Sequence, residues 1–242
     1  MIALFKAHEA LAESIHDKER LGMFYSALGL ALNHREQFTE SYTYLCKSLK
    51  LGEETKSPKV TGYACLRLSM TCSSLGYLDD AVTYGKRARD LSDDPDADLP
   101  LHRTDLALSI AYWYRGDVRK LRKVSAELLD KGRKRSDPRC LAACEIASGL
   151  SHIGAGDFQA ATEGFKAALQ TSIDPLLIQS STLMLGFAYL ANGQYQEALS
   201  LSQEVMDFSE KYGFESLGTP ALGFMGYALA ATGDLDRGLE FI

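Results

Sequence analysis

Two cysteines one helical turn apart, Cys140 and Cys144, come closest to a chemical site in this sequence. A thiol acts as a nucleophile beside a basic residue and binds zinc in C-x-x-C pairs. The five cysteines form no such pair, and none of the five histidines has ligand-like spacing to a cysteine or an acid. The chain also lacks a P-loop, H-E-x-x-H and G-x-S-x-G. We therefore expect no catalytic residue, no metal and no cofactor, and we interpret the cysteines as small buried hydrophobic residues.

The net charge and the lengths of the apolar runs limit the kinds of partner that the chain can have. The formal net charge of −6 argues against a general nucleic-acid binder, which needs a basic surface to contact phosphates. No run of about 18 apolar residues is present, so we expect no membrane-spanning helix. The N-terminus carries Lys6, His8 and Glu9 where a signal peptide would be apolar, and a cytoplasmic location follows by default.

A short pattern recurs six times and indicates the elements that position the other side chains. Each copy has a turn residue, an apolar residue two places on and, in most copies, a small residue three places further. The last residues of the copies are separated by 40, 40, 40, 37 and 40 positions: Ser41, Ala81, Leu121, Ala161, Ala198 and Gly238. A small residue also recurs seven places before each turn residue: Gly29, Ser69, Ser109, Gly149, Gly186 and Gly226.

Each copy is typical of a helix, a tight turn and a second helix. The turn residue is usually glycine, as at Gly76, because glycine adopts the left-handed conformation that ends a helix at little cost. The small residues are expected where the paired helices cross. Turn residues with a proline near the next helix predict loops between copies, at residues 53–58, 93–100, 136–138, 172–175 and 213–220.

Helix pairs with a Gly-x-aromatic-x-x-Ala signature, as in Gly156–Ala161 and Gly193–Ala198, resemble the tetratricopeptide (TPR) repeat. The period is about 40 residues rather than the usual 34. The resemblance implies an all-α, right-handed superhelical solenoid of about six repeats. The expected single array has a second helix at residues 1–16 and repeats at residues 17–56, 57–98, 99–136, 137–173, 174–216 and 217–242.

Long repeats of this kind are similar to the TPR-like arrays of ATP-dependent LuxR-type activators and to the tails of adenylate or guanylate cyclases with an ATPase module. The repeat phase places Met1 and Ile242 inside helices. Array ends normally have a polar capping face, whereas these ends are apolar. We therefore expect a fragment of a longer bacterial signalling protein, with self-association through the ends as an option.

In a TPR array the first helix of each pair lines the concave face, so the resemblance implies a partner-binding surface there. The predicted partner-binding residues are Tyr63, Arg67, Met70, Arg103, Ile110, Trp113, Tyr114, Leu150, Phe187 and Tyr227. Leu30 and Asn33 lie on the same expected face. A carboxylate clamp built from Asn and Lys is not favoured, because the residues that follow the recurring small positions are mostly apolar. The alternative is that the array buries this apolar stripe in its own core.

A second candidate surface is basic. Residues 115–139 contain ten basic and four acidic residues, a net charge of +6. The predicted outer-face patch consists of Arg119, Lys120, Arg122, Lys123, Arg133, Lys134 and Arg135. It could dock an acidic partner, or it could be an ordinary solvated face near the acidic segment 90–98.

Three functions remain open from the sequence. The first is a non-catalytic scaffold that binds a protein or peptide. The second is a small-molecule or peptide sensor within a transcription regulator, and the third is a structural or self-association spacer. A closed aromatic pocket would favour the sensor, and a long apolar groove would favour the scaffold.

Overall fold

The computed structural model describes residues 1–241, and every regular element in that range is helical. Fourteen α-helices and one 3-10 helix follow one another, which confirms the expected all-α fold. Ile242, the last residue of the expected apolar end, lies outside the described range. The chain divides into two compact units, unit 1 (Met1–Asp117) and unit 2, which starts at Val118.

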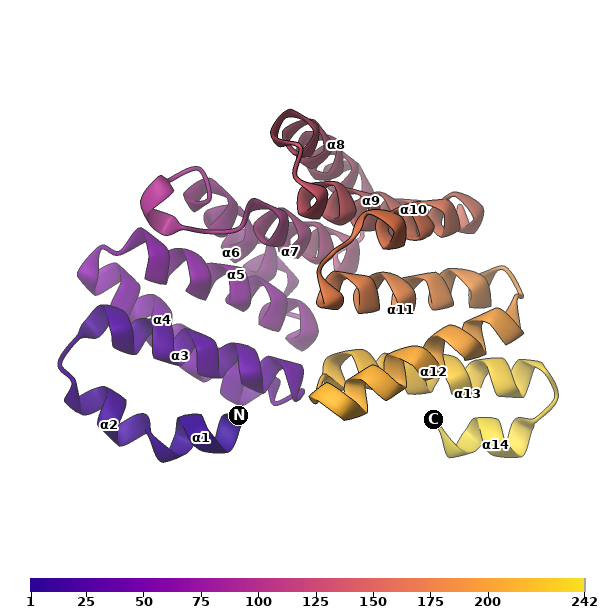
Figure 1. Cartoon of the computed structure of the whole chain (residues 1–242), viewed down its shortest axis with the longest axis horizontal. Coiled ribbons are helices and arrows are strands. Elements are labelled where there is room, and N and C mark those ends of the chain that lie inside the picture. Colours follow the sequence, from indigo (N-terminus) through magenta and orange to yellow (C-terminus); the bar gives the residue numbers. More distant parts are fainter. Residues whose placement is uncertain (242) are drawn as a thin grey trace. The chain divides into compact units, whose positions relative to one another are not determined.

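Unit 1 is a succession of antiparallel helix neighbours (Figure 1). Its elements are α1 (Ile2–Ala7), α2 (Glu9–Ser14), α3 (Lys18–His34), α4 (Phe38–Thr55), α5 (Pro58–Leu75), α6 (Leu78–Leu91), η1 (Pro95–Ala97) and α7 (Leu101–Tyr114). Each helix from α3 to α6 packs on the next, and α5 also packs directly against both α3 and α7. Thus α3, α5 and α7, the first helices of their pairs, form one layer.

Unit 2 repeats this arrangement. Its helices are α8 (Val118–Arg135), α9 (Pro138–Gly154), α10 (Phe158–Thr171), α11 (Pro175–Ala191), α12 (Tyr195–Tyr212), α13 (Glu215–Ala231) and α14 (Leu235–Glu240). Each packs on the next, and α11 also contacts α9 and α13. Among the described helices of both units, none is both long and apolar enough to cross a membrane.

The turns inside the helix pairs have the predicted left-handed backbone. The five turn glycines have φ between 74° and 99°: Gly76, Gly116, Gly156, Gly193 and Gly233. An added Cβ would meet nothing within 4 Å at any of them, so backbone conformation alone explains the glycine. In the first copy Glu36 takes the same conformation, with φ of 55°.

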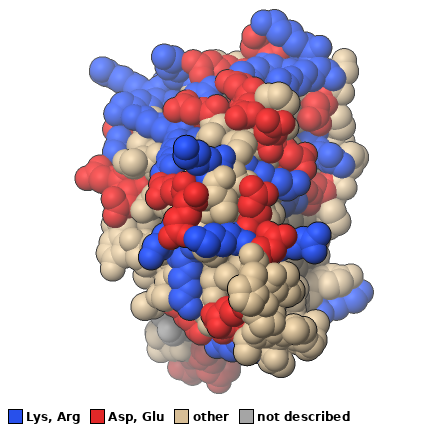
Figure 2. Space-filling view, turned by 90° about the vertical axis from the view of Figure 1, so that its left-hand side faces the viewer, with Lys and Arg blue, Asp and Glu red and all other residues tan. Residues whose placement is uncertain are grey.

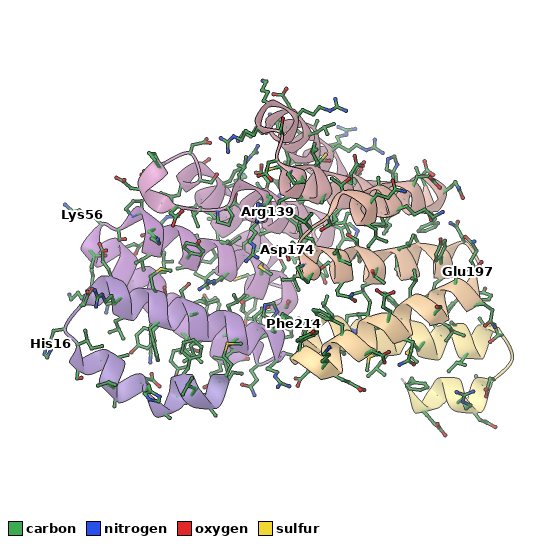
Figure 3. All side chains as sticks on the ribbon, viewed as in Figure 1. His16, Lys56, Arg139, Asp174, Glu197 and Phe214 are labelled. Atoms are coloured by element: carbon green, nitrogen blue, oxygen red, sulfur yellow. The ribbon has the colours of Figure 1, made fainter. Side chains whose placement is uncertain are left out.

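The loops between pairs begin helices with side-chain caps. Ser57 accepts a hydrogen bond from the Val60 amide, and Asp174, labelled in Figure 3, accepts one from the Leu176 amide. Proline follows both caps at the first helical position. Two predicted loops are wrong. Residues 53–58 are mostly helix, because α4 runs to Thr55 and α5 starts at Pro58. Residues 213–220 are also mostly helix, because α13 starts at Glu215 just after the left-handed Gly213. Pro220 lies inside this helix, where it removes one backbone hydrogen bond without ending it.

Small residues let the paired helices approach closely. Ala81, Ala161 and Ala198 are fully buried. A Cβ added to Gly149 would lie 2.7 Å from the ring of Phe165 on the partner helix. In the first pair the Ser41 hydroxyl on α4 donates to the Gly29 carbonyl on α3 at 2.7 Å. The recurring positions therefore set the distance between the two helices in these pairs.

The N-terminal segment departs from its expected form. Residues 1–16 were expected to be one second helix, but they form α1 and α2, separated at His8. Leu4, Leu11 and Ile15 on this segment are more than half exposed. Self-association through such apolar ends remains a prediction.

Candidate functional site

Helix α5 keeps a single stripe of accessible side chains. Between Lys59 and Ser74 every residue is buried except Tyr63, Arg67 and Met70. The accessible positions are spaced by three or four residues, so they lie on one face of the helix. Because all other faces of α5 are packed, the stripe is the only surface this segment offers to a partner. The repeat phase predicted all three residues.

Helix α7 keeps a matching stripe. From Arg103 to Tyr114 only Arg103, Leu106, Ile110, Trp113 and Tyr114 are accessible. The rings of Trp113 and Tyr114 lie 5.0 Å apart, and Tyr114 is 53% exposed. The predicted residues of this helix therefore form a surface in unit 1 that ends in an aromatic pair.

Helix α3 completes this surface. In its second half only Ala27, Leu30 and His34 are accessible, again with helical spacing. Asn33 was expected on the same face, but it is buried and its amide donates to the Thr71 hydroxyl at 3.0 Å. We call the accessible stripes of α3, α5 and α7 the first-helix face, with these members: Ala27, Leu30, His34, Tyr63, Arg67, Met70, Arg103, Leu106, Ile110, Trp113 and Tyr114.

Arg67 lies at the centre of the first-helix face. Its guanidinium donates to the hydroxyl of the buried Ser26 on α3 at 2.6 Å. It also lies over the ring of Tyr63, 5.1 Å from the centroid. The Tyr63 hydroxyl in turn donates to the Asp98 carbonyl at 3.1 Å, and the Asp98 carboxylate pairs with Lys59 at 2.9 Å. These contacts fix Arg67 and Tyr63 in position before any ligand binds.

The first-helix face is electrostatically positive around Arg67. Burial, and to a lesser extent the nearby Arg103, lower the pKa of Arg67 to about 10. Burial together with Arg103 and Arg67 lowers the pKa of His34 to about 4. His34 is therefore neutral at pH 7, and the two arginines supply the charge. The sequence analysis missed Ser26 and His34, although His34 lies one helical turn after Leu30.

Unit 2 holds the other three predicted partner-binding residues. Phe187 on α11 is half-buried against Phe224 on α13, with ring centroids 5.5 Å apart. Tyr227 is 56% exposed and lies near Tyr195. Leu150 was predicted wrongly, because it is only 2% exposed. Met70 and Ile110, which precede Leu150 by two repeats and one repeat, are accessible, whereas in α9 the accessible residue is Ser148, two positions earlier. The accessible stripe of α9 therefore consists of Leu141, Glu145, Ser148 and His152, and Leu150 points inward.

The predicted basic patch lies on α8. All seven of its side chains are exposed, and Lys123 and Lys134 form ion pairs with acids one turn away, Glu127 and Asp130. Lys and Arg side chains gather in the upper part of the face drawn in Figure 2, with Asp and Glu side chains among them. Lower on this face, basic and acidic side chains alternate. Binding of an acidic partner by this patch remains a prediction.

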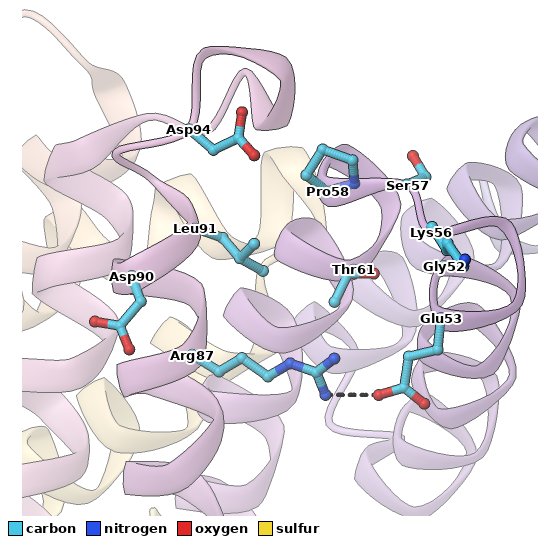
Figure 4. A pocket seen from close by; sticks show the side chains of 10 residues that line it. All are labelled: Gly52, Glu53, Lys56, Ser57, Pro58, Thr61, Arg87, Asp90, Leu91 and Asp94. Carbon is cyan, nitrogen blue, oxygen red and sulfur yellow. Dashed lines mark hydrogen bonds and ion pairs between the residues drawn. The ribbon is translucent and has the colours of Figure 1, made fainter.

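A hollow of about 740 Å³ on unit 1 was not predicted (Figure 4). Its walls come from the turn between α4 and α5 and from α6. Arg87 on α6 and Glu53 on α4 form an ion pair of 2.6 Å across it, and Asp90 and Asp94 also line it, from α6 and from the segment after α6. With charges of both signs and open walls, it defines no particular ligand.

Three of the five cysteines, Cys65, Cys72 and Cys144, lack the surroundings of reactive thiols. Burial raises the pKa of Cys65 to about 11 and of Cys72 to about 12. Burial also raises the pKa of Cys144, whose thiol donates to the Ser125 carbonyl at 3.3 Å. A raised pKa keeps a thiol protonated, so these side chains behave as packing residues.

Comparison with known proteins confirms the fold class. No family model and no curated sequence matches the chain. Among solved structures, NprR in complex with its cognate peptide NprX has a TM-score of 0.74 at 14% identity, covering 99% of this chain and 71% of NprR. A Rap protein complexed with Competence and Sporulation Factor has a TM-score of 0.65 at 13% identity, covering 99% and 72%. A STAND protein with a tetratricopeptide repeat sensor from Pyrococcus horikoshii has a TM-score of 0.54 at 16% identity, covering 92% and 37%. The chain has the fold of a TPR-like helical-repeat array.

Proposed function

We propose that this chain is a non-catalytic module that binds an extended or helical peptide segment of a partner on its first-helix face. The observation that carries the proposal is the set of stripes on α3, α5 and α7. The second half of α3 and the central parts of α5 and α7 are packed on all sides but one, and the open sides carry aromatic, apolar and arginine side chains. Such residues are the usual anchors of protein interfaces, and apolar helix faces are a recurring mode of peptide recognition.

The similarity to NprR and the Rap protein supports a peptide as the ligand, because NprR was solved with its cognate peptide and the Rap protein with Competence and Sporulation Factor. The similarity to a signal-transduction ATPase with a repeat sensor supports a regulatory role within a larger signalling protein. The spacer function gains no support from the first-helix face, since a spacer needs no accessible arginine and aromatic side chains.

A peptide selection tests the proposal. The purified chain would be incubated with a soluble library of random synthetic octapeptides, and retained peptides identified by mass spectrometry. We expect binders whose affinity for Ile110→Asp falls by at least about tenfold, because the new carboxylate lies within the apolar part of the face. Ile173→Asp is the matched control, since Ile173 is 63% exposed in a loop of unit 2. Absence of any binder, or equal loss in both variants, would contradict the proposed site.

A further inference from the structure

Three arginines of unit 1 are partly buried, and only one of them lacks a carboxylate. Arg89 pairs with the buried Asp105 at 2.7 Å, and Arg115 pairs with Asp79 at 2.9 Å and also with Asp117. Arg67 forms no ion pair with any described residue. Partly buried charges in proteins are normally paired, so the exception needs an explanation.

The bonding of Arg67 leaves most of its donors unused. A guanidinium has five N–H groups in a planar fork, and Arg67 uses one of them, toward Ser26, among the described residues. Its side chain is nonetheless held in place by Ser26 on one side and the Tyr63 ring on the other. A fixed fork with free donors is preorganised to receive a planar acceptor with two oxygens.

The surroundings favour a negative ligand at this position. Arg103, on the neighbouring helix and exposed, adds a second positive charge that acts on both Arg67 and His34. The carboxylate at the edge of the cluster, that of Asp98, is engaged by Lys59. No ligand is needed to hold the fold here, because Ser26 and Tyr63 already position the guanidinium.

We propose that Arg67 and Arg103 together bind a carboxylate of the peptide that occupies the first-helix face. The proposal rests on the proposed function and specifies the chemistry of its ligand. A singly charged, planar carboxylate matches the fork of Arg67, while Arg103 contributes charge from the rim. The carboxylate belongs to an acidic side chain or to the peptide's C-terminus, and both present the same two oxygens.

The test uses the full chain and the octapeptides retained in the selection described above. Each binder is resynthesised in two forms. In one, every Asp is replaced by Asn and every Glu by Gln; in the other, only the C-terminus is amidated. We expect one of these changes to weaken binding to the unsubstituted chain by at least about tenfold. The same change should cost less than about twofold on Arg67→Gln, because the partner of the carboxylate is already gone.

Two controls separate charge recognition from folding. Arg87→Gln removes an exposed arginine of the same unit that pairs with Glu53, and it should bind as the unsubstituted chain does. If Arg67→Gln has a markedly lower Tm than the unsubstituted chain, the same binding measurement is made on Arg103→Gln. The pKa of His34, followed by NMR, should rise when an acidic peptide binds, because the added negative charge offsets the two arginines.

The outcomes separate the two proposals. Binders that lose affinity with Ile110→Asp but are indifferent to their carboxylates would overturn the carboxylate site and leave the peptide-binding function standing. Binders displaced by inorganic phosphate, with no preference for carboxylates, would also overturn it in favour of a phosphate site. A selection that retains no peptide would overturn both proposals.

Discussion

At the scale of single residues, Arg67 and Arg89 show two ways of placing a guanidinium beneath the surface of unit 1. Arg89 is 20% exposed and neutralises Asp105, which is fully buried. Arg67 donates to the Ser26 hydroxyl and lies over the Tyr63 ring, and it pairs with no carboxylate among residues 1–241. The repeat phase predicted that Arg67 lies on the first-helix face. It could not predict that Arg67 lacks a counter-ion, because that depends on neighbours contributed by α3 and α7.

His34 predicts a pH dependence of stability. Its pKa is lowered to about 4 in the folded chain, against about 6.5 when unfolded. Between these values the unfolded chain binds more protons, so stability falls as the pH drops from 6.5 toward 4. For this one group the loss between pH 7 and pH 5 is at most about 2 kcal/mol.

We expect the variant His34→Gln to remove that part of the pH dependence. The measurement is urea unfolding at pH 7 and pH 5 for both proteins. His8→Gln is the control, since His8 is exposed on α1. Equal pH slopes for the unsubstituted chain and His34→Gln would show that burial and the two arginines do not lower the pKa of His34 as the structure indicates.

At the scale of elements, the periodicity of the sequence predicted most of the helix pairs, since the turn glycines and helix caps are local signals. Two kinds of feature escaped it. The helix start at Glu215 precedes a proline that the sequence pattern assigned to a loop. The inward position of Leu150 depends on the rotation of α9 about its own axis, which is set by packing and has no local signal.

The small residues at which paired helices cross allow a prediction about stability. Ala161 and Ala198 are fully buried where α10 and α12 cross their partners. Replacing either with Leu inserts three carbon atoms into a closed contact and should destabilise the chain by about 1–3 kcal/mol. Thermal unfolding should show this as a fall in Tm of about 2–4 °C per kcal/mol.

The same substitution at an exposed helical position provides the comparison. Ala126 lies on the solvent side of α8, and Ala126→Leu should change stability by less than about 0.5 kcal/mol. If Ala161→Leu and Ala198→Leu have the same Tm as the unsubstituted chain, the small residues do not set the distance between the paired helices.

At the scale of the whole molecule, contacts within each unit join each helix mainly to its immediate neighbours. Stability in such arrays is close to a sum of local terms, and parts of the chain can open separately. The spacing of the repeats gave no indication of the division after Asp117. It falls in the copy that has Leu121 at the position where the others have Ala, Ser or Gly. The sequence-based expectation of one continuous array remains a prediction.

Hydrogen exchange on Asp105→Ala tests whether the two units open independently. Removing Asp105 leaves Arg89 without its buried partner, a change that typically costs about 3–5 kcal/mol. We expect amides of α5, α6 and α7 to exchange at least about 100-fold faster, while amides in residues 118–241 keep their rates. Arg87→Ala, which breaks the exposed pair with Glu53, should change exchange little in either unit, since such pairs contribute about 0–1 kcal/mol. If the exchange rates of Asp105→Ala rise equally in both units, the chain opens as one cooperative body, and a ligand on the first-helix face would then stabilise the whole array rather than unit 1 alone.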